Sequence, residues 1–393
     1  MSFSNTPILR RQRSQVRILS GAPVNGACRI APNLRTLAIC GKSRYAAKTA
    51  MERAIYQFDN LPVGPADAAG EERVRATGDQ RVGVILNTRS HRNQDREPDL
   101  GGHGGVTLAR PQTRRDIAHA LADFARQPID LLVISGGDGT VRDVLTMGQT
   151  VFQDGWPAIA ILPRGKTNAL NVDLGSPRDW TLAQAIAEFR NPQGRRVTRR
   201  PLAVQAVSSR EPPMLGFILG AGAFALGVEA GQGAHKAGFF NSLAVGVTSL
   251  WGVIEALLGS DTNRWRRGAA MELRDLDSAV PFPRSRHGHA PRRTLLLAST
   301  LQTMPMHIQL FGKQDGAIRI VLLDHARRRV LALAPAILAG WHPRWLAKAG
   351  LHHLVSDGFA LTIEEPFILD GEHFPAGAYR VQQGPELTFV AGR

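Results

Sequence analysis

Three short apolar runs, each followed by a polar loop, constrain the fold of this chain more than any other feature. They cover residues 82–86, 130–135 and 158–162. Each is apolar throughout rather than in alternation, which is typical of strands buried on both faces. Apolar residues recur at helical spacing in 113–126 and 179–189. Strands that alternate with helices predict an α/β domain built on a parallel sheet.

The second half of the chain has a different texture. At 393 residues the chain is long enough for two domains. From residue 200 onward, short strand-like runs are separated by Gly and Pro, and they lie at 202–207, 215–219, 270–273, 293–301, 317–323, 359–363 and 387–390. We therefore expect a lead-in at 1–80, an α/β domain at 81–199 and a β-rich domain at 200–393, whose last segment returns toward the cleft.

The N-terminal segment carries most of the basic charge. Residues 1–50 hold nine Lys and Arg, no acidic residue and both cysteines, Cys28 and Cys40. No apolar run there is long enough for the core of a signal peptide. The composition fits either a transit peptide or conceptual translation of DNA upstream of a true start at Met51. We favour the second interpretation and expect 1–80 to be unstructured.

Composition excludes several classes of protein. The whole chain has a net charge of +15, but only +6 belongs to residues 51–393. That excess fits attraction to a membrane surface or a nucleotide and does not indicate nucleic-acid binding. With no cysteine after Cys40 and no pair of histidines at metal-binding spacing, we expect no zinc site. The Walker A and dinucleotide-binding glycine motifs are also absent.

Glycine-rich loops follow two of the predicted strands. The first, Gly136-Gly-Asp-Gly-Thr140, allows backbone N–H groups to approach a phosphate closely. Asp138 would need a cation or a donor between itself and that phosphate. The alternative is a plain turn in which Asp138 caps the next helix. The second loop, Gly165–Asn168, carries Lys166, either as a point charge beside phosphate or as a solvated lysine.

These motifs, in this order, resemble the diacylglycerol kinase catalytic-domain family, which includes bacterial lipid kinases and the sphingosine kinases. The resemblance rests on Gly136–Thr140, on Pro163-x-Gly-x-x-Asn168 and on Asp370-Gly-Glu372. It implies an ATP-NAD kinase-like α/β domain with a parallel sheet, followed by a β-sandwich. It also implies ATP- and Mg²⁺-dependent phosphorylation of a lipid hydroxyl, such as that of diacylglycerol or a sphingoid base.

The resemblance also implies roles for individual residues. Glu372 is the candidate general base, and Asp138 belongs to a metal–water network beside it, although Asp370-Gly371 is equally a hairpin turn signal. Asp315, with carbonyl groups of the Gly312 and Ala317 segment, is the candidate metal site. The residues implied in nucleotide binding are Asn87, Gly136, Gly137, Asp138, Gly139, Thr140, Val141, Arg142, Gly165, Lys166, Thr167 and Asn168.

Two departures from the family keep other functions open. Lys166 stands where the family commonly has Thr, and Ala169 stands where it has Asp, so one carboxylate of the usual charge network is missing. The alternatives are an NAD kinase-like enzyme and a protein that binds nucleotide or lipid without turnover.

Lipid as substrate predicts an apolar groove and a membrane-facing surface. Phe224, Phe239, Phe240 and Leu243 are candidates for the groove, and the helical run 241–258 is expected to be a core element rather than a membrane span. Trp265–Arg267 and Trp341–Trp345 mix Trp with Arg, as membrane interfaces do, or are ordinary exposed loops. We expect a cytoplasmic protein that associates peripherally with membranes.

Three acidic residues carry no predicted role. Asp173 is expected to lie on the surface of a helix, and Glu364 and Glu365 are expected to be solvated charges at a strand edge.

Overall fold

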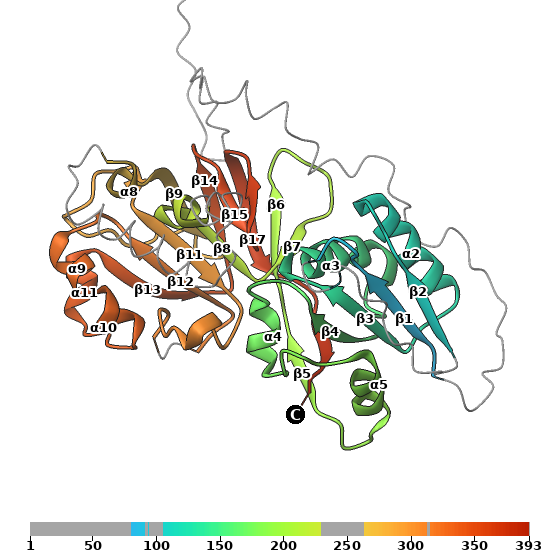
Figure 1. The fold of residues 1–393 in the computed structure, drawn as a ribbon. Coiled ribbons are helices and arrows are strands. Elements are labelled where there is room, and N and C mark those ends of the chain that lie inside the picture. Colours follow the sequence, from blue (N-terminus) through green and yellow to red (C-terminus); the bar gives the residue numbers. More distant parts are fainter. Residues whose placement is uncertain (1–79, 91–92, 94–104, 229–262, 313–314, 393) are drawn as a thin grey trace, which may run out of the picture. The chain divides into compact units, whose positions relative to one another are not determined.

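The computed structural model describes residues 80–90, 93, 105–228, 263–312 and 315–392 (Figure 1). These residues belong to one compact unit, Ala54–Arg393. Our expectations for residues 1–79, for the helix at 241–258 and for Phe239, Phe240 and Leu243 lie outside the described residues.

The first sheet is the predicted parallel sheet. The strand order is β2-β1-β3-β4-β18-β5, and every pair is parallel except β18 with β5. The strands are β1 (Val82–Leu86), β2 (Val106–Ala109), β3 (Leu131–Gly136), β4 (Ala158–Pro163), β5 (Arg196–Arg199) and β18 (Leu387–Val390). β1 and β3 are buried throughout, which explains their unbroken apolar sequence.

Helices cover both faces of this sheet. Apolar residues of α2 (Arg114–Arg126) and α3 (Asp138–Phe152) pack against one face. Those of α5 (Leu182–Arg190) pack against the other, and the short α4 (Ala169–Leu174) follows β4. α2 and α5 begin at similar capping boxes, made by Thr113 with Asp116 and by Thr181 with Gln184.

The second half forms two six-stranded sheets whose facing side chains share one core, so the β-sandwich is confirmed. One sheet has the order β10-β9-β14-β17-β6-β7 and the other β13-β12-β11-β8-β15-β16. The strands are β6 (Leu202–Ala206), β7 (Met214–Gly216), β8 (Ile218–Gly222), β9 (Ala269–Asp275), β10 (Arg292–Arg293), β11 (Leu295–Ser299), β12 (Ile318–Leu323), β13 (Leu351–Ser356), β14 (Gly358–Ile363), β15 (Phe367–Leu369), β16 (Glu372–Phe374) and β17 (Gly377–Gln383).

Short helices lie in the connections between the sandwich strands. They are α8 (Arg264–Arg267), the 3₁₀ helix η1 (Pro305–His307), α9 (Arg328–Ala332), α10 (Ala334–Leu338) and α11 (Trp345–Ala349). The last three lie next to β13, the edge strand of the sandwich sheet that runs from β13 to β16. In the part of the chain that is described, no helix is both long and apolar enough to span a bilayer.

Two predicted strands differ from expectation. The run at 215–219 is divided between β7 and β8, which belong to different sheets. The run at 387–390, which was grouped with the β-rich domain although its segment was expected to return toward the cleft, is a strand that pairs with β4 and β5 in the first sheet. Its pairing partners are set by tertiary packing, which an isolated apolar run does not encode.

Two predictions about acidic residues were wrong. Asp173 is buried at the end of α4, where its carboxylate accepts hydrogen bonds from Arg199 Nε at 2.6 Å and from the Thr303 backbone N–H at 2.6 Å. Glu365 is half-buried and pairs with Arg292 at 2.9 Å. Each carboxylate faces a partner distant in sequence, which spacing alone does not reveal.

Candidate active site

The two glycine loops touch each other at the carboxyl ends of β3 and β4. A Cβ atom built on Gly137 would lie 2.9 Å from the Gly165 Cα atom, and one built on Gly165 would lie 2.6 Å from the Gly137 Cα atom. Gly136 is equally constrained, because its Cβ would lie 2.5 Å from Thr140. No larger residue fits these positions without moving backbone, so the glycines bring the two loops together.

Asn87 and Asn168 fix the loops. Asn87 follows β1 and donates from Nδ2 to Thr140 Oγ1 at 2.8 Å. Asn168 adopts a left-handed backbone conformation with φ of 50°, which asparagine tolerates better than most residues. Its side chain both accepts from the Gly165 N–H and donates to the Gly165 carbonyl, each at 2.8 Å.

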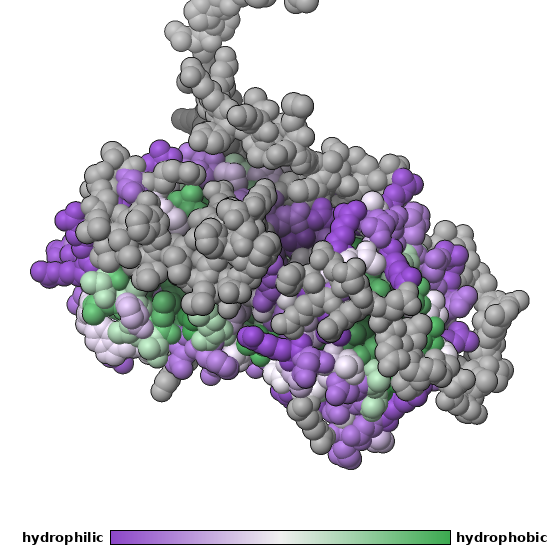
Figure 2. Space-filling model, viewed as in Figure 1, coloured by the Kyte–Doolittle hydropathy of each residue, from purple (hydrophilic) through white to green (hydrophobic). Residues whose placement is uncertain are grey.

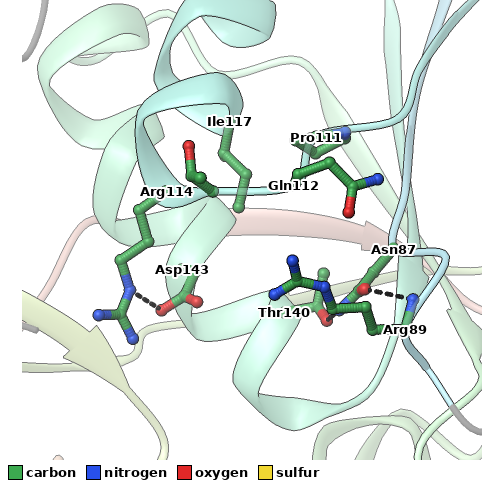
Figure 3. A pocket seen from close by; sticks show the side chains of 9 residues that line it. Asn87, Arg89, Pro111, Gln112, Arg114, Ile117, Thr140 and Asp143 are labelled. Carbon is green, nitrogen blue, oxygen red and sulfur yellow. Dashed lines mark hydrogen bonds and ion pairs between the residues drawn. The ribbon is translucent and has the colours of Figure 1, made fainter.

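A polar pocket of about 200 Å³ opens beside Thr140. Figure 3 shows side chains from the β1 end, from the start of α2 and from α3 turned toward one space. Arg89 and Arg114 supply positive charge from two sides, and Thr113 is the cap of α2. The lining residues are Asn87, Arg89, Pro111, Gln112, Thr113, Arg114, Ile117, Thr140 and Asp143.

The Asp-Gly-Glu motif forms a tight hairpin between β15 and β16. Asp370 and Gly371 have φ values of 46° and 82°, and Leu369 pairs with Glu372 across the turn. Positive φ at both central residues is the geometry that Asp-Gly favours in two-residue hairpins. The turn interpretation is therefore correct, and the turn also presents Glu372 to the α/β domain.

Glu372 is held by two arginines of the α/β domain. Arg114 Nη2 donates to both carboxylate oxygens, at 2.8 and 2.7 Å, and Arg142 pairs with the same carboxylate. Both arginines also bond Asp143, Arg114 through Nε at 3.0 Å and Arg142 through Nη2 at 2.8 Å. We call Arg114, Arg142, Asp143 and Glu372 the arginine cluster.

Charge is balanced within the arginine cluster. Burial lowers the pKa of Arg114, but Asp143 and Glu372 more than offset that effect, so its pKa lies above the usual value. Arg142 is only 3% exposed and donates also to the Leu369 carbonyl at 3.3 Å. The Glu372 carboxylate could accept a proton only after the guanidinium group of Arg114 or Arg142 had moved away from it.

Asp138 does not face open solvent. It is the first residue of α3, but its carboxylate accepts hydrogen bonds from the backbone N–H groups of Asn168, Ala169 and Leu170, at the start of α4. Burial nevertheless raises the pKa of Asp138 to about 6. It therefore caps the helix after the second loop, a contact that neither sequence interpretation foresaw.

Asp370 faces Asp138 across a very small cavity. The cavity has a volume of about 10 Å³ and is lined by Asp138, Val141, Ala169, Leu170, Phe217 and Asp370. The Asp370 carboxylate accepts from the backbone N–H groups of Phe217 and Ile218, each at 2.9 Å. Burial, together with the charge of Asp138, raises the pKa of Asp370 to about 7.

The remaining predicted nucleotide residues lie in three environments. Val141 is 2% exposed and packs in the core, so only its backbone could face a ligand. Gly139 is partly buried in the first turn of α3, and Arg142 is committed to the arginine cluster. Lys166 and Thr167 are exposed at the second loop.

The predicted metal segment has one carboxylate. Asp315 is exposed, Gly312 has a φ of 69°, and the Ala317 carbonyl accepts from Gln383 Nε2 at 3.2 Å. Across the described ranges, no three His, Cys, Asp or Glu residues gather at one place. These donors do not make up a magnesium site by themselves, so the segment stays a prediction and we derive no step through it.

Sequence reasoning missed the arginine that completes the site. Arg114 lies 258 residues from Glu372 in the chain, and nothing in its spacing distinguishes it from Arg115. A charged residue in the first turn of a helix that follows an edge strand is the one signal that could have drawn attention to Arg114.

Comparison with known proteins supports the family resemblance of the α/β domain. The sequence model of the diacylglycerol kinase catalytic domain matches residues 81–198. The match covers the α/β domain, so the resemblance to the diacylglycerol kinase catalytic domain rests on that part of the chain. A Bacillus subtilis diacylglycerol kinase is 36% identical over 70 residues, which are 18% of this chain and 22% of that protein. The chain thus spans about a fifth of the length of this curated relative.

Solved structures share the fold. A protein of Bacillus anthracis assigned as a diacylglycerol kinase superposes with a TM-score of 0.54 at 14% identity, over 79% of this chain and 97% of its own. A second structure of a diacylglycerol kinase from the same organism gives 0.52 at 13% identity, with the same coverage. The likeness extends beyond the α/β domain, because 79% of the chain includes much of the sandwich.

Proposed function

We propose that this protein is a lipid kinase that transfers the γ-phosphate of ATP to a lipid hydroxyl. The observation that supports this most is the meeting of four parts at one place. These are the two glycine loops, the pocket lined by Arg89 and Arg114, and the Glu372 carboxylate. Phosphoryl transfer depends mainly on positioning and charge neutralisation, and these parts supply both.

The nucleotide would enter as its Mg²⁺ complex, which neutralises part of the phosphate charge. Backbone N–H groups of the loop at Gly136–Thr140, at the start of α3, would donate to phosphate oxygens, and Lys166 would add a positive charge from the second loop. The pocket of about 200 Å³ is smaller than the roughly 300–1,000 Å³ of a complete ligand site. We therefore assign it to one part of the nucleotide.

Glu372 is the proposed base. Its carboxylate takes the proton of the lipid hydroxyl, the hydroxyl oxygen bonds to the γ-phosphorus, and the bond between that phosphorus and the β–γ bridging oxygen breaks to release ADP. Incoming phosphate competes for Arg114, which lines the pocket and holds Glu372. Binding of ATP would thereby free the base, so that it acts only when the donor is present.

The acceptor is a lipid with a free hydroxyl, of the diacylglycerol or sphingoid type, and the protein would work peripherally at a cytoplasmic membrane surface where ATP is available. The deciding experiment incubates the purified protein with γ-labelled ATP, Mg²⁺ and a total lipid extract, and with NAD in a parallel reaction. We expect label in one lipid. Label in NADP would favour the NAD kinase-like function, and ATP binding without transfer would favour a non-catalytic protein.

Glu372→Gln supplies the site-specific arm of this experiment. Loss of a general base lowers transfer by about 10²–10⁴-fold, while Arg114 and Arg142 keep Asp143 as a partner. The matched control is Glu386→Gln, which removes an exposed carboxylate paired with Arg200. If Glu372→Gln transfers phosphate at the wild-type rate, Glu372 is not the base.

A further inference from the structure

Beyond the active site, exposed tryptophans lie beside basic residues at the start of α11 and in the loop that joins α10 to α11. Leu338, Trp341 and Trp345 are 39%, 47% and 43% exposed, and Arg344 and Lys348 are exposed between and after the tryptophans. We call these five residues the tryptophan surface. Figure 2 shows hydrophobic residues gathered at the lower left, where Figure 1 labels α10 and α11.

The exposed residues do not hold these helices in place. Other side chains of α9, α10 and α11 do so, because Val330, Ile337 and Leu346 are at most 4% exposed and pack in a core with residues of β11, β12 and β13. Ile337 and Leu346 are thus buried, while Leu338 and Trp345 of the same two helices are exposed. The buried residues hold the helices in place, and the exposed apolar residues can contact a partner.

The exposed tryptophans are ordered against each other. The rings of Trp341 and Trp345 pack edge to face with centroids 6.0 Å apart. The segment after η1 lies beside α10, because the Gln309 N–H donates to the Leu338 carbonyl at 2.9 Å, and Met306 of η1 is 79% exposed. A rigid aromatic pair inserts at low entropic cost, since its conformation is already fixed.

The charge around the surface is of one sign. Residues 325–356 contain five Lys and Arg and no acid, and residues 278–312 contain no acid either. Asp324 is buried, where it pairs with Arg293 and His352. Asp357 follows β13 at the end of that strand away from α11. Anionic groups would meet no repulsion at the tryptophan surface.

We propose that the tryptophan surface docks this protein on a bilayer that contains anionic phospholipid. Trp side chains prefer the level of the headgroups, where the ring is in apolar surroundings and its N–H stays wet. Lys and Arg beside them attract anionic lipid. The surface lies on the sandwich, apart from the glycine loops, so it adds attachment to the membrane rather than a part of the phosphate-transfer site.

The test measures sedimentation of the full chain with phosphatidylcholine vesicles, with and without about 30% phosphatidylglycerol as the source of anionic charge. We expect binding only with phosphatidylglycerol. Trp341→Ala/Trp345→Ala and Arg344→Gln/Lys348→Gln should each weaken binding about tenfold or more at low salt. Quenching of Trp fluorescence by brominated lipid should fall in the tryptophan variant.

A control variant removes two basic side chains from another part of the protein. Arg115→Gln/Arg190→Gln deletes two exposed charges of the α/β domain, and it should bind vesicles as the wild type does. Because Trp341 and Trp345 are exposed, thermal unfolding of the tryptophan variant should match that of the wild type. The proposal is overturned if the tryptophan variant binds vesicles as well as the wild type does. It is also overturned if the wild type binds neutral vesicles equally well or binds no vesicles, and either of these results would favour a protein partner or no partner at this surface.

Discussion

Two carboxylates of one hairpin turn, Asp370 and Glu372, lie in opposite electrostatic environments. Glu372 faces two guanidinium groups in the arginine cluster. Asp370 faces backbone N–H groups and a second carboxylate, Asp138, and its pKa is raised by burial and by the charge of Asp138. The difference teaches that the Asp-Gly-Glu motif has two jobs. Glu372 is the proposed base, and Asp370 ties the turn to the backbone of Phe217 and Ile218 at an electrostatic cost.

The largest expected effect comes from adding a third acid to the cavity beside Asp370. Ala169 lines that cavity with Asp138 and Asp370, so Ala169→Asp adds a third carboxylate beside two others. We expect Ala169→Asp to be less stable than Ala169→Asn by about 3 kcal/mol at pH 8. Chemical denaturation of both variants measures the difference, and the Asn variant accounts for the added volume.

The same pair of variants can contradict this account of the cavity. At pH 5 the added carboxyl group is protonated at little cost, so the gap between the two variants should narrow. A gap that stays constant from pH 5 to pH 8 would show that the cavity is not electrostatically unfavourable to negative charge.

Removing the charge of Asp370 should stabilise the protein, whereas Ala169→Asp should destabilise it. Its pKa is raised to about 7, so the folded state binds the proton more tightly than the unfolded state, and stability falls as pH rises from about 4 to about 7. Asp370→Asn should therefore stabilise the protein at pH 8 by an amount on the order of 2 kcal/mol. Its amide oxygen can still accept from the Phe217 and Ile218 N–H groups.

Denaturation at several pH values tests this sign. The unfolding free energy of Asp370→Asn should depend less on pH than that of the wild type. The control is Asp357→Asn at an exposed position, which should change neither the stability at pH 8 nor its pH dependence. If Asp370→Asn is less stable at pH 8, the carboxylate must stabilise the turn through the two N–H groups more than burial destabilises it.

The arginine cluster should respond in kinetics more than in stability. Arg114 is a quarter exposed and leaves Arg142 on Glu372 when it is removed. Since incoming phosphate is proposed to take over Arg114, Arg114→Gln should raise the KM for ATP about tenfold with a smaller change in kcat. Arg115→Gln, which alters the exposed neighbour on the same helix, should leave both constants unchanged. An unchanged KM in Arg114→Gln would leave the release of Glu372 by ATP without support.

The difference between the two halves of the molecule also explains what the sequence could predict. Val82–Leu86 was predicted residue for residue, because each buried parallel strand is a continuous apolar run. Gly137 and Gly165 meet because loops at the carboxyl ends of adjacent parallel strands share one edge of the sheet. In the sandwich, the run at 215–219 was placed in one strand because the change of sheet leaves no periodic signal.

Long-range ion pairs were beyond prediction for a related reason. Arg114 with Glu372, and Asp173 with Arg199, are contacts whose members are separated by 258 and 26 residues. Periodicity reports which side of an element is buried, but it does not report what that side faces. Asp138 shows the same limit, since its true partners are backbone N–H groups of a different loop.

The smallest expected effect comes from two similar helix N-caps, Thr113 of α2 and Thr181 of α5. Thr113 and Thr181 each accept from an N–H three residues later, at 3.2 Å in both cases, so Thr113→Ala and Thr181→Ala should each cost about 1 kcal/mol of stability. Only Thr113 lines the pocket, and only its variant should raise the KM for ATP, by about threefold to fivefold for one lost hydrogen bond. Equal kinetics in the two variants would mean that the start of α2 serves the fold alone, and that the nucleotide lies nearer the loop of Lys166.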